Sequence, residues 1–329
     1  MNTEQIATVR NLHKNFDAIT AVDGISLDIL QGEVFGLLGP NGAGKTTTIS
    51  ILSGSLKPTS GEVHVAGFDA CKAPPAMRMA LGVVPQELSI YMKLTGRENL
   101  EFFGSLYGMH GDALGARVDS MLAMVGLSER SGDRAADYSG GMKRRLNLAV
   151  GLMHNPRLLL LDEPTVGVDP QSRNHIFEGV RSLNQQGLSV LYTSHYMEEV
   201  QALCHRVGIM DRGKLIACDT VPNLISSLGG SVIEIGIGGS DRLPALIAHL
   251  SSMELIKDVE ASDPPQDSGE HGTEENPQIL RVRTEHVNRV LPLLVSALTK
   301  FGAPIYSLNI REPNLEDVFL TLTGKTLRD

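Results

Sequence analysis

Residues 39–46 read Gly39-Pro40-Asn41-Gly42-Ala43-Gly44-Lys45-Thr46, and this run constrains the fold more than any other part of the sequence. It follows the apolar segment Val34 to Leu38 and leads into the helix-forming segment Thr46 to Leu52. Glycines in such a loop let backbone N–H groups turn inward at a helix N-terminus, where the partial positive charge favours anions. The pattern G-x-x-x-x-G-K-[ST] between a strand and a helix therefore predicts a phosphate-binding loop.

The side chains of this loop have distinct expected roles. Lys45 supplies a mobile positive charge to the phosphates, and the Thr46 hydroxyl can bind Mg²⁺. An ordinary glycine turn is the alternative, but the Lys45-Thr46 pair in register argues against it. The other nucleotide-binding candidates in the loop and the first turn of its helix are Gly39, Asn41, Gly42, Gly44 and Thr47.

Two carboxylates follow a second apolar segment. Leu158 to Leu161 is continued directly by Asp162 and Glu163. Parallel sheets present their ligands at the carboxyl ends of strands, so we expect both side chains near the phosphate loop. Asp162 is predicted to hold Mg²⁺. Glu163 is predicted to orient and deprotonate an attacking water, as the general base of phosphoryl transfer.

The order of apolar segments indicates the fold class. Short strand-like runs such as Val190 to Thr193 alternate with helix-length segments, which is typical of a parallel α/β sheet buried on both faces. Within 88–155 no strand run occurs and apolar residues recur at helical spacing, so we expect a helical insertion there. At 329 residues, with 42% hydrophobic side chains, the chain can form this domain and a smaller second one.

The second domain is expected to begin after Gly229. Its predicted elements run strand, helix, strand, strand, helix, strand, which is the order of the ferredoxin-like fold. Asp258 to Glu275 contains seven carboxylates and no Lys or Arg, so we expect a flexible acidic loop over 258–277. Further on, Leu315 to Leu322 carries an apolar stripe at helical spacing, which must be buried either in its own domain or against a second subunit.

Composition argues against several classes of protein. The net charge of −9 disfavours general nucleic-acid binding, which needs a basic face. Residues 1–5 lack the features of a signal peptide, and no apolar stretch reaches the roughly 18 residues of a membrane helix. We therefore expect a soluble, intracellular protein. Cys71, Cys204 and Cys218 show neither metal-ligand nor disulfide spacing and are expected to be free thiols.

A further motif precedes the strand that carries the two carboxylates. It reads Tyr138-Ser139-Gly140-Gly141-Met142-Lys143-Arg144-Arg145-Leu146 and resembles the signature sequence of ATP-binding cassette (ABC) proteins. Tyr138 stands where Leu is commonest in the family, and Met142 where Gln is commonest. The core Ser139-Gly140-Gly141, which the family places against the γ-phosphate of ATP, is intact.

Other family positions occur in the expected order along residues 4–229. Gln86 matches the glutamine loop and His195 the switch histidine, so the resemblance implies that both act with Glu163 in hydrolysis, and that Gln86 also contacts Mg²⁺. Asp169 matches the nucleotide-site loop after the catalytic glutamate. Phe16 lies where the family places an aromatic ring that stacks on adenine; a core Phe is the alternative.

The resemblance implies a P-loop ABC nucleotide-binding domain over 1–229, with a mixed sheet core, an antiparallel β subdomain and the helical insertion. A small C-terminal α+β ferredoxin-like domain, regulatory or dimerising, would occupy 230–329. Two copies would pack head to tail around ATP and Mg²⁺. The tail Pro313 to Gly324 is similar to that of daunorubicin-resistance-type and A-subfamily exporter ATPases. An ATPase that drives a separate permease at the inner face of the cell membrane is therefore expected.

Two other functions stay open at this point. A soluble ABC ATPase with a non-transport role predicts two fused cassettes, a coiled-coil insertion or a basic tail, and the sequence shows none of them. A regulatory cassette that binds nucleotide without hydrolysing it is opposed by Glu163 and His195. By family resemblance, Glu87, Leu88 and Tyr91 are candidates for contact with the permease.

Overall fold

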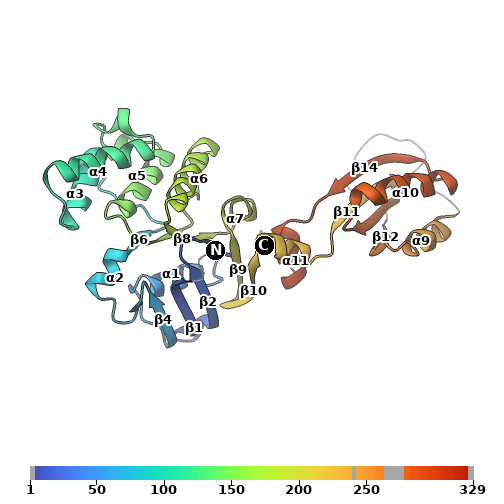
Figure 1. Ribbon diagram of the computed structural model, residues 1–329, viewed down its shortest axis with the longest axis horizontal. Helices are drawn as coiled ribbons and strands as arrows, with labels where there is room; N and C mark the ends of the chain where they lie inside the picture. Colours follow the sequence, from blue (N-terminus) through green and yellow to red (C-terminus); the bar gives the residue numbers. More distant parts are fainter. Residues whose placement is uncertain (1–3, 239–241, 263–277, 325–329) are drawn as a thin grey trace. The chain divides into compact units, whose positions relative to one another are not determined.

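The computed structural model describes residues 4–238, 242–262 and 278–324 of the chain. These residues form two compact units that divide between Val221 and Pro222. In Figure 1 the first unit runs from blue to yellow and the second from yellow to red. Each unit has its own sheet and its own hydrophobic core.

A six-stranded sheet forms the centre of the N-terminal unit. Its order is β10-β9-β3-β8-β7-β6, and all neighbours are parallel except the edge pair β10 and β9. The inner strands β3, β7 and β8 are buried along their whole length, as parallel strands covered on both faces must be. The strands are β3 (Val34–Leu38), β6 (Leu81–Val84), β7 (Leu158–Asp162), β8 (Ser189–Ser194), β9 (Arg206–Asp211) and β10 (Lys214–Thr220).

A second, antiparallel sheet has the order β2-β1-β4-β5. One hydrophobic core joins it to the central sheet, with Val9 and Ile25 from the former and Phe35 and Leu160 from the latter. The predicted mixed core with an antiparallel β subdomain is therefore confirmed. The strands of this second sheet are β1 (Gln5–Phe16), β2 (Ile19–Leu30), β4 (Ser60–Val65) and β5 (Phe68–Asp69).

Helices fill the predicted insertion between β6 and β7. α3 begins at a capping box in which Thr95 and Glu98 bond each other's backbone N–H groups. The insertion comprises α3 (Gly96–Leu106), α4 (Gly111–Met124), two short 3₁₀ turns (Ser128–Arg130 and Ala135–Asp137) and α5 (Gly140–Leu152). The remaining helices of the unit are α1 (Lys45–Leu52), α2 (Pro75–Ala80), α6 (Pro170–Gln185) and α7 (Met197–Leu203).

The structure explains the unusual tyrosine of the signature sequence. Tyr138 is 3% exposed, and its hydroxyl donates to the Arg130 carbonyl oxygen at 2.7 Å. Burial raises the pKa of this phenol above its ordinary value. A Cβ at Gly96 would lie 2.2 Å from the hydroxyl oxygen. Glycine at 96 therefore makes the room that a tyrosine needs at the position where the family commonly has leucine.

The C-terminal unit is an antiparallel sheet of order β12-β13-β11-β14, and the helices α9 and α10 share its hydrophobic core. Ile233, Leu280 and Val282 of the sheet pack with Leu246 and Leu294 of these helices. The predicted ferredoxin-like order is confirmed. The elements are α8 (Val221–Ser226), β11 (Ser231–Ile237), α9 (Leu243–Ser251), β12 (Asp258–Ser262), β13 (Gln278–Thr284), α10 (Val287–Lys300), β14 (Ile305–Arg311) and α11 (Leu315–Thr323).

The boundary between the units lies earlier than the sequence predicts. The expected division at Gly229 falls inside the C-terminal unit. The reason is that the Arg283 guanidinium of β13 donates to the Leu228 carbonyl oxygen at 3.1 Å. This hydrogen bond ties the connecting segment to the C-terminal sheet.

The prediction of a flexible acidic loop starting at residue 258 is wrong for its first residues. Asp258–Ser262 is the strand β12, which pairs with β13 along its full length. Val259 packs against the core of the unit. Side chains along a strand point alternately to its two faces, so the segment can bury Val259 and form a strand although its neighbours are negatively charged. The rest of the predicted loop, 263–277, lies outside the described residues.

The apolar stripe near the C-terminus forms α11. Asn314 and Asp317 make a capping box at its start. Leu315, Val318 and Phe319 are buried within the chain, whereas Leu320 and Leu322 are exposed. Most of the stripe is thus covered by the chain itself, without a second subunit.

Candidate active site

β3 leads directly into the phosphate loop, which ends at the first turn of α1. Gly44, the residue before α1, has φ of 103°, in the left-handed region that favours glycine. A Cβ at Gly39 would lie 2.4 Å from the Met210 carbonyl oxygen of β9. Glycine at both positions lets the loop turn tightly between the central strands and the helix N-terminus, where N–H groups can face an anion.

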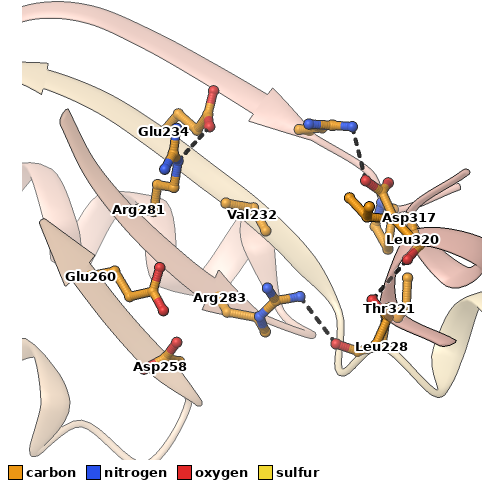
Figure 2. Close-up of a pocket in the computed structure, with 12 residues that line it drawn as sticks. Leu228, Val232, Glu234, Asp258, Glu260, Arg281, Arg283, Asp317, Leu320 and Thr321 are labelled. Carbon is orange, nitrogen blue, oxygen red and sulfur yellow. Dashed lines mark hydrogen bonds and ion pairs between the residues drawn. The ribbon is translucent and has the colours of Figure 1, made fainter. Parts of the chain in front are cut away.

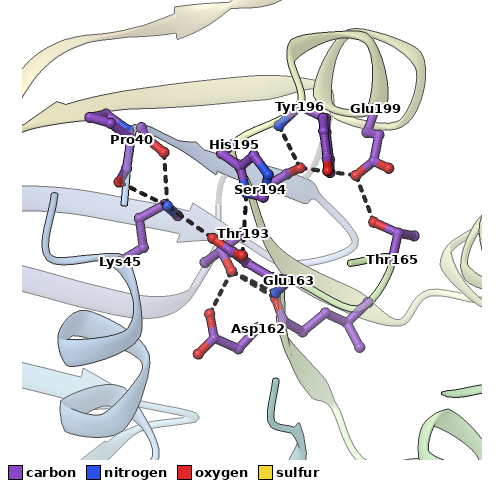
Figure 3. Close-up of polar contacts among 12 residues, drawn as sticks. Pro40, Lys45, Asp162, Glu163, Thr165, Thr193, Ser194, His195, Tyr196 and Glu199 are labelled. Carbon is purple, nitrogen blue, oxygen red and sulfur yellow. Dashed lines mark hydrogen bonds and ion pairs between the residues drawn. The ribbon is translucent and has the colours of Figure 1, made fainter. Parts of the chain in front are cut away.

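Lys45 points from the start of α1 across this loop (Figure 3). Its ammonium donates to the carbonyl oxygens of Gly39, at 2.8 Å, and Pro40, at 3.1 Å. The third neighbour is the Glu163 carboxylate, with Oε1 3.1 Å from Nζ. Two of the ammonium protons are thus donated to backbone carbonyls, and the buried lysine charge forms an ion pair with a buried carboxylate.

Thr193 of β8 connects the two carboxylates at the end of β7. Its hydroxyl accepts a hydrogen bond from the Glu163 backbone N–H at 3.0 Å and donates to Asp162 Oδ1 at 2.7 Å. The strand register places Thr193 opposite Asp162. Sequence analysis did not single out this residue, although its position two residues before His195 was an available signal.

Glu163 sits between a lysine and a histidine (Figure 3). Its Oε2 lies 3.3 Å from His195 Nδ1, while Oε1 faces Lys45. The backbone φ of Glu163 is 46°, the left-handed region. Such a conformation costs about 1–3 kcal/mol in a residue with a side chain and is concentrated at functional sites. The fold therefore holds this buried carboxylate in one strained position between two potentially cationic groups.

Gln86 follows β6, the neighbour of β7, and so lies at the same edge of the sheet. Its side chain is exposed, and its backbone carbonyl oxygen accepts a hydrogen bond from the Arg144 guanidinium of α5. Arg145 donates to the Val125 carbonyl oxygen at 2.7 Å. Burial lowers the pKa of both guanidinium groups. These two arginines link α5 to its surroundings.

The signature residues lie at the start of α5. Ser139 is the N-cap, and its hydroxyl accepts from the Met142 N–H at 3.2 Å. A Cβ at Gly141 would lie 2.1 Å from Ser172 Oγ and 2.8 Å from Asp169 Oδ2, both at the start of α6. Asp169 caps α6 by accepting from the Ser172 N–H at 2.9 Å, which lowers the pKa of the aspartate. Gly141 is therefore needed for close packing of the two helix starts in one chain.

The remaining predicted site residues are accessible. Phe16 ends β1 and is 44% exposed, so it is not a core residue. The Lys14 ammonium lies 4.8 Å from the centre of its ring. Asn41 and Thr46 are exposed, and Thr47 is half-buried.

A pocket of about 270 Å³ lies on the C-terminal unit (Figure 2). Three arginines line it, and each already has a partner. Arg281 is paired with Glu234 at 2.8 Å, Arg311 with Asp317 at 2.8 Å, and Arg283 donates to a backbone carbonyl. Because these charges are satisfied within the protein, the pocket has no set of free donors for an anionic ligand.

Comparison with known proteins identifies the family. The model described as "ABC transporter" matches residues 22–166. The linearmycin resistance ATP-binding protein LnrL of Bacillus subtilis is 44% identical over 97% of this chain and 98% of its own length. The chain belongs to the ATP-binding subunits of ABC transporters. It is also 37% identical to the daunorubicin resistance ATP-binding protein DrrA2 of Streptomyces coeruleorubidus, over 95% of this chain and 93% of that protein.

A further relative is the Nod factor export ATP-binding protein I of Rhizobium meliloti, with 38% identity over 98% of this chain and 89% of that protein. Among solved structures, the dimeric post-hydrolysis state of an ATP-binding cassette bound to ADP and Pi has 25% identity and a TM-score of 0.61, covering 65% of this chain and 98% of that one. The chain is thus an ABC ATPase of the resistance and export type. No helix in the described ranges is both long and apolar enough to cross a bilayer.

Proposed function

We propose that this ABC ATPase binds and hydrolyses MgATP in a head-to-tail homodimer and thereby drives a separate membrane permease for export. The observation that carries the proposal is the buried Glu163 carboxylate between Lys45 and His195 at the mouth of the phosphate loop. The names of its relatives, which concern resistance and export, support the direction of transport.

ATP binding follows from groups already aimed at this site. The backbone N–H groups of the loop and of the α1 N-terminus receive the phosphates, and Lys45 exchanges its carbonyl acceptors for phosphate oxygens. Thr47 adds a further polar group in the first turn. The Phe16 ring, which is 44% exposed, is proposed to stack on the adenine.

Hydrolysis requires a water placed in line with the bond between the γ-phosphorus and the leaving oxygen of ADP. Glu163 accepts a proton from this water while the water oxygen attacks the γ-phosphorus, and the bond from the γ-phosphorus to the ADP oxygen breaks. His195, 3.3 Å from Glu163, is placed to hold the carboxylate and to contact the transferred phosphate. Gln86, at the same sheet edge, helps to orient the water.

The residues expected to hold Mg²⁺ have suitable chemistry. Thr46, Gln86 and Asp162 offer oxygen ligands, which this hard cation prefers. Within the described ranges, no cluster of three or more His, Cys, Asp or Glu side chains could bind a metal by itself. This fits an ion that arrives with the phosphates, because Mg²⁺ usually combines one or two protein ligands with substrate oxygens. When bound, Mg²⁺ would neutralise charge on the β- and γ-phosphates.

The dimer completes each site with a second chain. Ser139, Gly140 and Gly141 lie at the N-terminus of α5, whose dipole and N–H groups favour an anion. We assign them to the γ-phosphate bound by the partner subunit, with Asp169 beside them at the interface. ATP then joins the subunits, and loss of the γ-phosphate releases them.

This arrangement predicts a dimer that depends on both halves of the site. Glu163→Gln with MgATP is expected to elute as a dimer in size-exclusion chromatography with light scattering, because ATP is bound but not hydrolysed. Adding Ser139→Arg is expected to reduce the dimer at least about tenfold, because a large side chain fills the space of the phosphate. Ser128→Arg, at another exposed serine of the insertion, is the matched control. Equal dimer yields in the two arginine variants would contradict the proposed interface.

An aromatic surface beside the glutamine loop is the proposed permease contact. Tyr91 is 49% exposed and lies 4.9 Å from Phe102 and 5.9 Å from Phe103, measured between ring centres. A pocket of about 330 Å³ adjoins Tyr91 and Phe102. The buried Asn99 side chain fixes the Tyr91 backbone at 2.7 and 3.0 Å. Together with Glu87 and Leu88, this surface can receive a helix from the permease and hold the subunit at the inner membrane face.

Changing this surface is expected to weaken the contact between the ATPase and its proposed permease. Tyr91→Glu should lower co-purification with the permease about tenfold, since a charge replaces a central aromatic anchor. The Asn99 contacts to the backbone persist, so the thermal unfolding midpoint should stay within a few degrees of the wild-type value. Leu293→Glu, at an exposed leucine of α10, is the control. Normal permease recovery with Tyr91→Glu would favour the alternative, an ABC ATPase with a non-transport regulatory role.

The C-terminal ferredoxin-like domain is proposed to regulate association of the subunits. It contains none of the nucleotide-site motifs. Its exposed Leu320 and Leu322 are available for such a contact. The burial of the rest of the α11 stripe within the chain limits the surface that a partner could use.

A further inference from the structure

The most buried carboxylate near the site is one that no motif marks. Glu199, on α7, has a side chain that is 1% exposed. An ionised carboxylate in such a position must be surrounded by donors, because its desolvation is otherwise too costly. Its partners therefore show what the residue holds together.

Three hydroxyl groups converge on one oxygen of this carboxylate (Figure 3). Oε2 accepts hydrogen bonds from Thr165 Oγ at 2.8 Å, Tyr192 OH at 2.9 Å and Ser194 Oγ at 2.9 Å. All three donors are buried. Burial and the nearby charge of Glu199 raise the pKa of Tyr192 well above its ordinary value, so its hydroxyl keeps the proton that it donates.

The donors come from the two segments that carry the proposed catalytic groups. Thr165 lies two residues after Glu163, in the turn that follows β7. Ser194 immediately precedes His195, and its Oγ also accepts from the Tyr196 N–H at 2.9 Å. Glu199 thus fixes the chain on both sides of His195 and just beyond Glu163.

The other carboxylate oxygen faces a cation from a third element. Arg173 Nε of α6 lies 3.5 Å from Glu199 Oε1, an ion-pair distance without hydrogen-bond geometry. Asp169, the N-cap of α6, packs beside Gly141. Glu199 therefore joins the turn after β7, the strand β8 and the helix α6.

We infer that Glu199 is a positioning residue for ATP hydrolysis, which holds His195 and the Glu163 turn at their working separation. The inference rests on the proposed roles of Glu163 and His195. Glu163 has a left-handed backbone, which persists only where its surroundings determine it. The hydrogen bond from Thr165 to Glu199 helps to hold the turn that follows Glu163. The hydrogen bond from Ser194 to Glu199 holds the backbone next to His195, which faces Glu163.

A purely structural role makes a different prediction from a positioning role. Loss of general stability would change ATP binding and turnover together, and would not depend on His195. A positioning role acts on kcat, because the polar partners of Glu199 in the described part of the chain are Thr165, Tyr192, Ser194 and Arg173, and none of them belongs to the phosphate loop or to β1. The effect on kcat should also become smaller once His195, one of the positioned groups, is removed.

The test is the ATPase kinetics of the purified chain carrying Glu199→Gln. The amide keeps the size of the side chain but cannot accept from three hydroxyls as a carboxylate does. We expect kcat to fall about ten- to a hundredfold, as for small displacements of reacting groups, and KM for ATP to change less than about twofold. Glu198→Gln, the same change at the exposed neighbouring residue, should match wild type.

A double-mutant cycle with His195→Ala supplies the second readout. In that background Glu199→Gln should reduce kcat by a smaller factor than in the wild-type background, because only the turn after Glu163 then remains to be displaced. Unchanged kcat in Glu199→Gln, a parallel rise of KM, or additive losses in the cycle would each overturn the inference. If Glu199→Gln does not fold, Ser194→Ala and Thr165→Val replace it, and normal kcat in both would be equally decisive. Wild-type hydrolysis by Glu163→Gln would instead refute the catalytic assignment itself.

Discussion

Glu163→Gln is expected to abolish most ATP turnover while ATP binding is retained. The amide cannot accept the proton of the attacking water, so the loss should be about a hundredfold or more, the usual contribution of a general base. The glutamine keeps an amide oxygen where the carboxylate oxygen lies 3.1 Å from Lys45 Nζ, and the phosphate loop is unchanged. Phosphate release measures turnover, and titration with a fluorescent ATP analogue measures affinity.

The control for Glu163→Gln is a carboxylate change outside the site. Glu198→Gln removes the same charge from an exposed position on α7 and should leave both measurements at wild-type values. Hydrolysis by Glu163→Gln at the wild-type rate would exclude Glu163 as the base.

Lys45→Ala is expected to weaken ATP binding about a hundredfold, because a charged donor to the phosphates is lost. The structure adds a second effect. Lys45 Nζ is 3.1 Å from the buried Glu163 carboxylate, so its removal leaves His195 as the ion-pair partner of that carboxylate among the described residues. We therefore also expect a lower free energy of unfolding, since a buried charge that loses one of its partners is destabilised.

A double variant separates the two effects of the lysine. Lys45→Ala with Glu163→Gln removes the unpaired charge, so stability should recover while ATP affinity stays low. Lys57→Ala, at an exposed lysine, is the control for loss of positive charge. ATP affinity within about twofold of wild type in Lys45→Ala would contradict the proposed phosphate contact.

Local patterns were sufficient to predict the fold. The glycine run is flanked by a strand and a helix, and the helical spacing within 88–155 marks the insertion. The C-terminal order of strands and helices gave the ferredoxin-like topology. These predictions succeeded because each depends on neighbouring residues. The acidic loop was predicted to begin too early, since the carboxylates of 258–262 suggested disorder, whereas pairing with β13 and the packing of Val259 stabilise the strand β12 there.

The part of the site that sequence could not predict is the part built from distant contacts. Lys45, Glu163 and His195 belong to recognisable motifs, and the structure brings them within contact of one another. Thr193 and Glu199 belong to none. Their importance follows from side chains that meet only after β7, β8, α6 and α7 have packed, and no spacing along the chain encodes such a meeting.

The left-handed backbone of Glu163 has an evolutionary consequence. Glycine is the residue that occupies this conformation without steric cost, so the change that best relaxes the backbone, Glu163→Gly, also deletes the carboxylate. Asn and Asp tolerate the conformation better than most residues, but their side chains are a methylene shorter than glutamate. At this position a change that relieves the backbone strain therefore removes or shortens the carboxylate proposed as the base, so selection for stability and selection for the proposed reaction act in opposite directions.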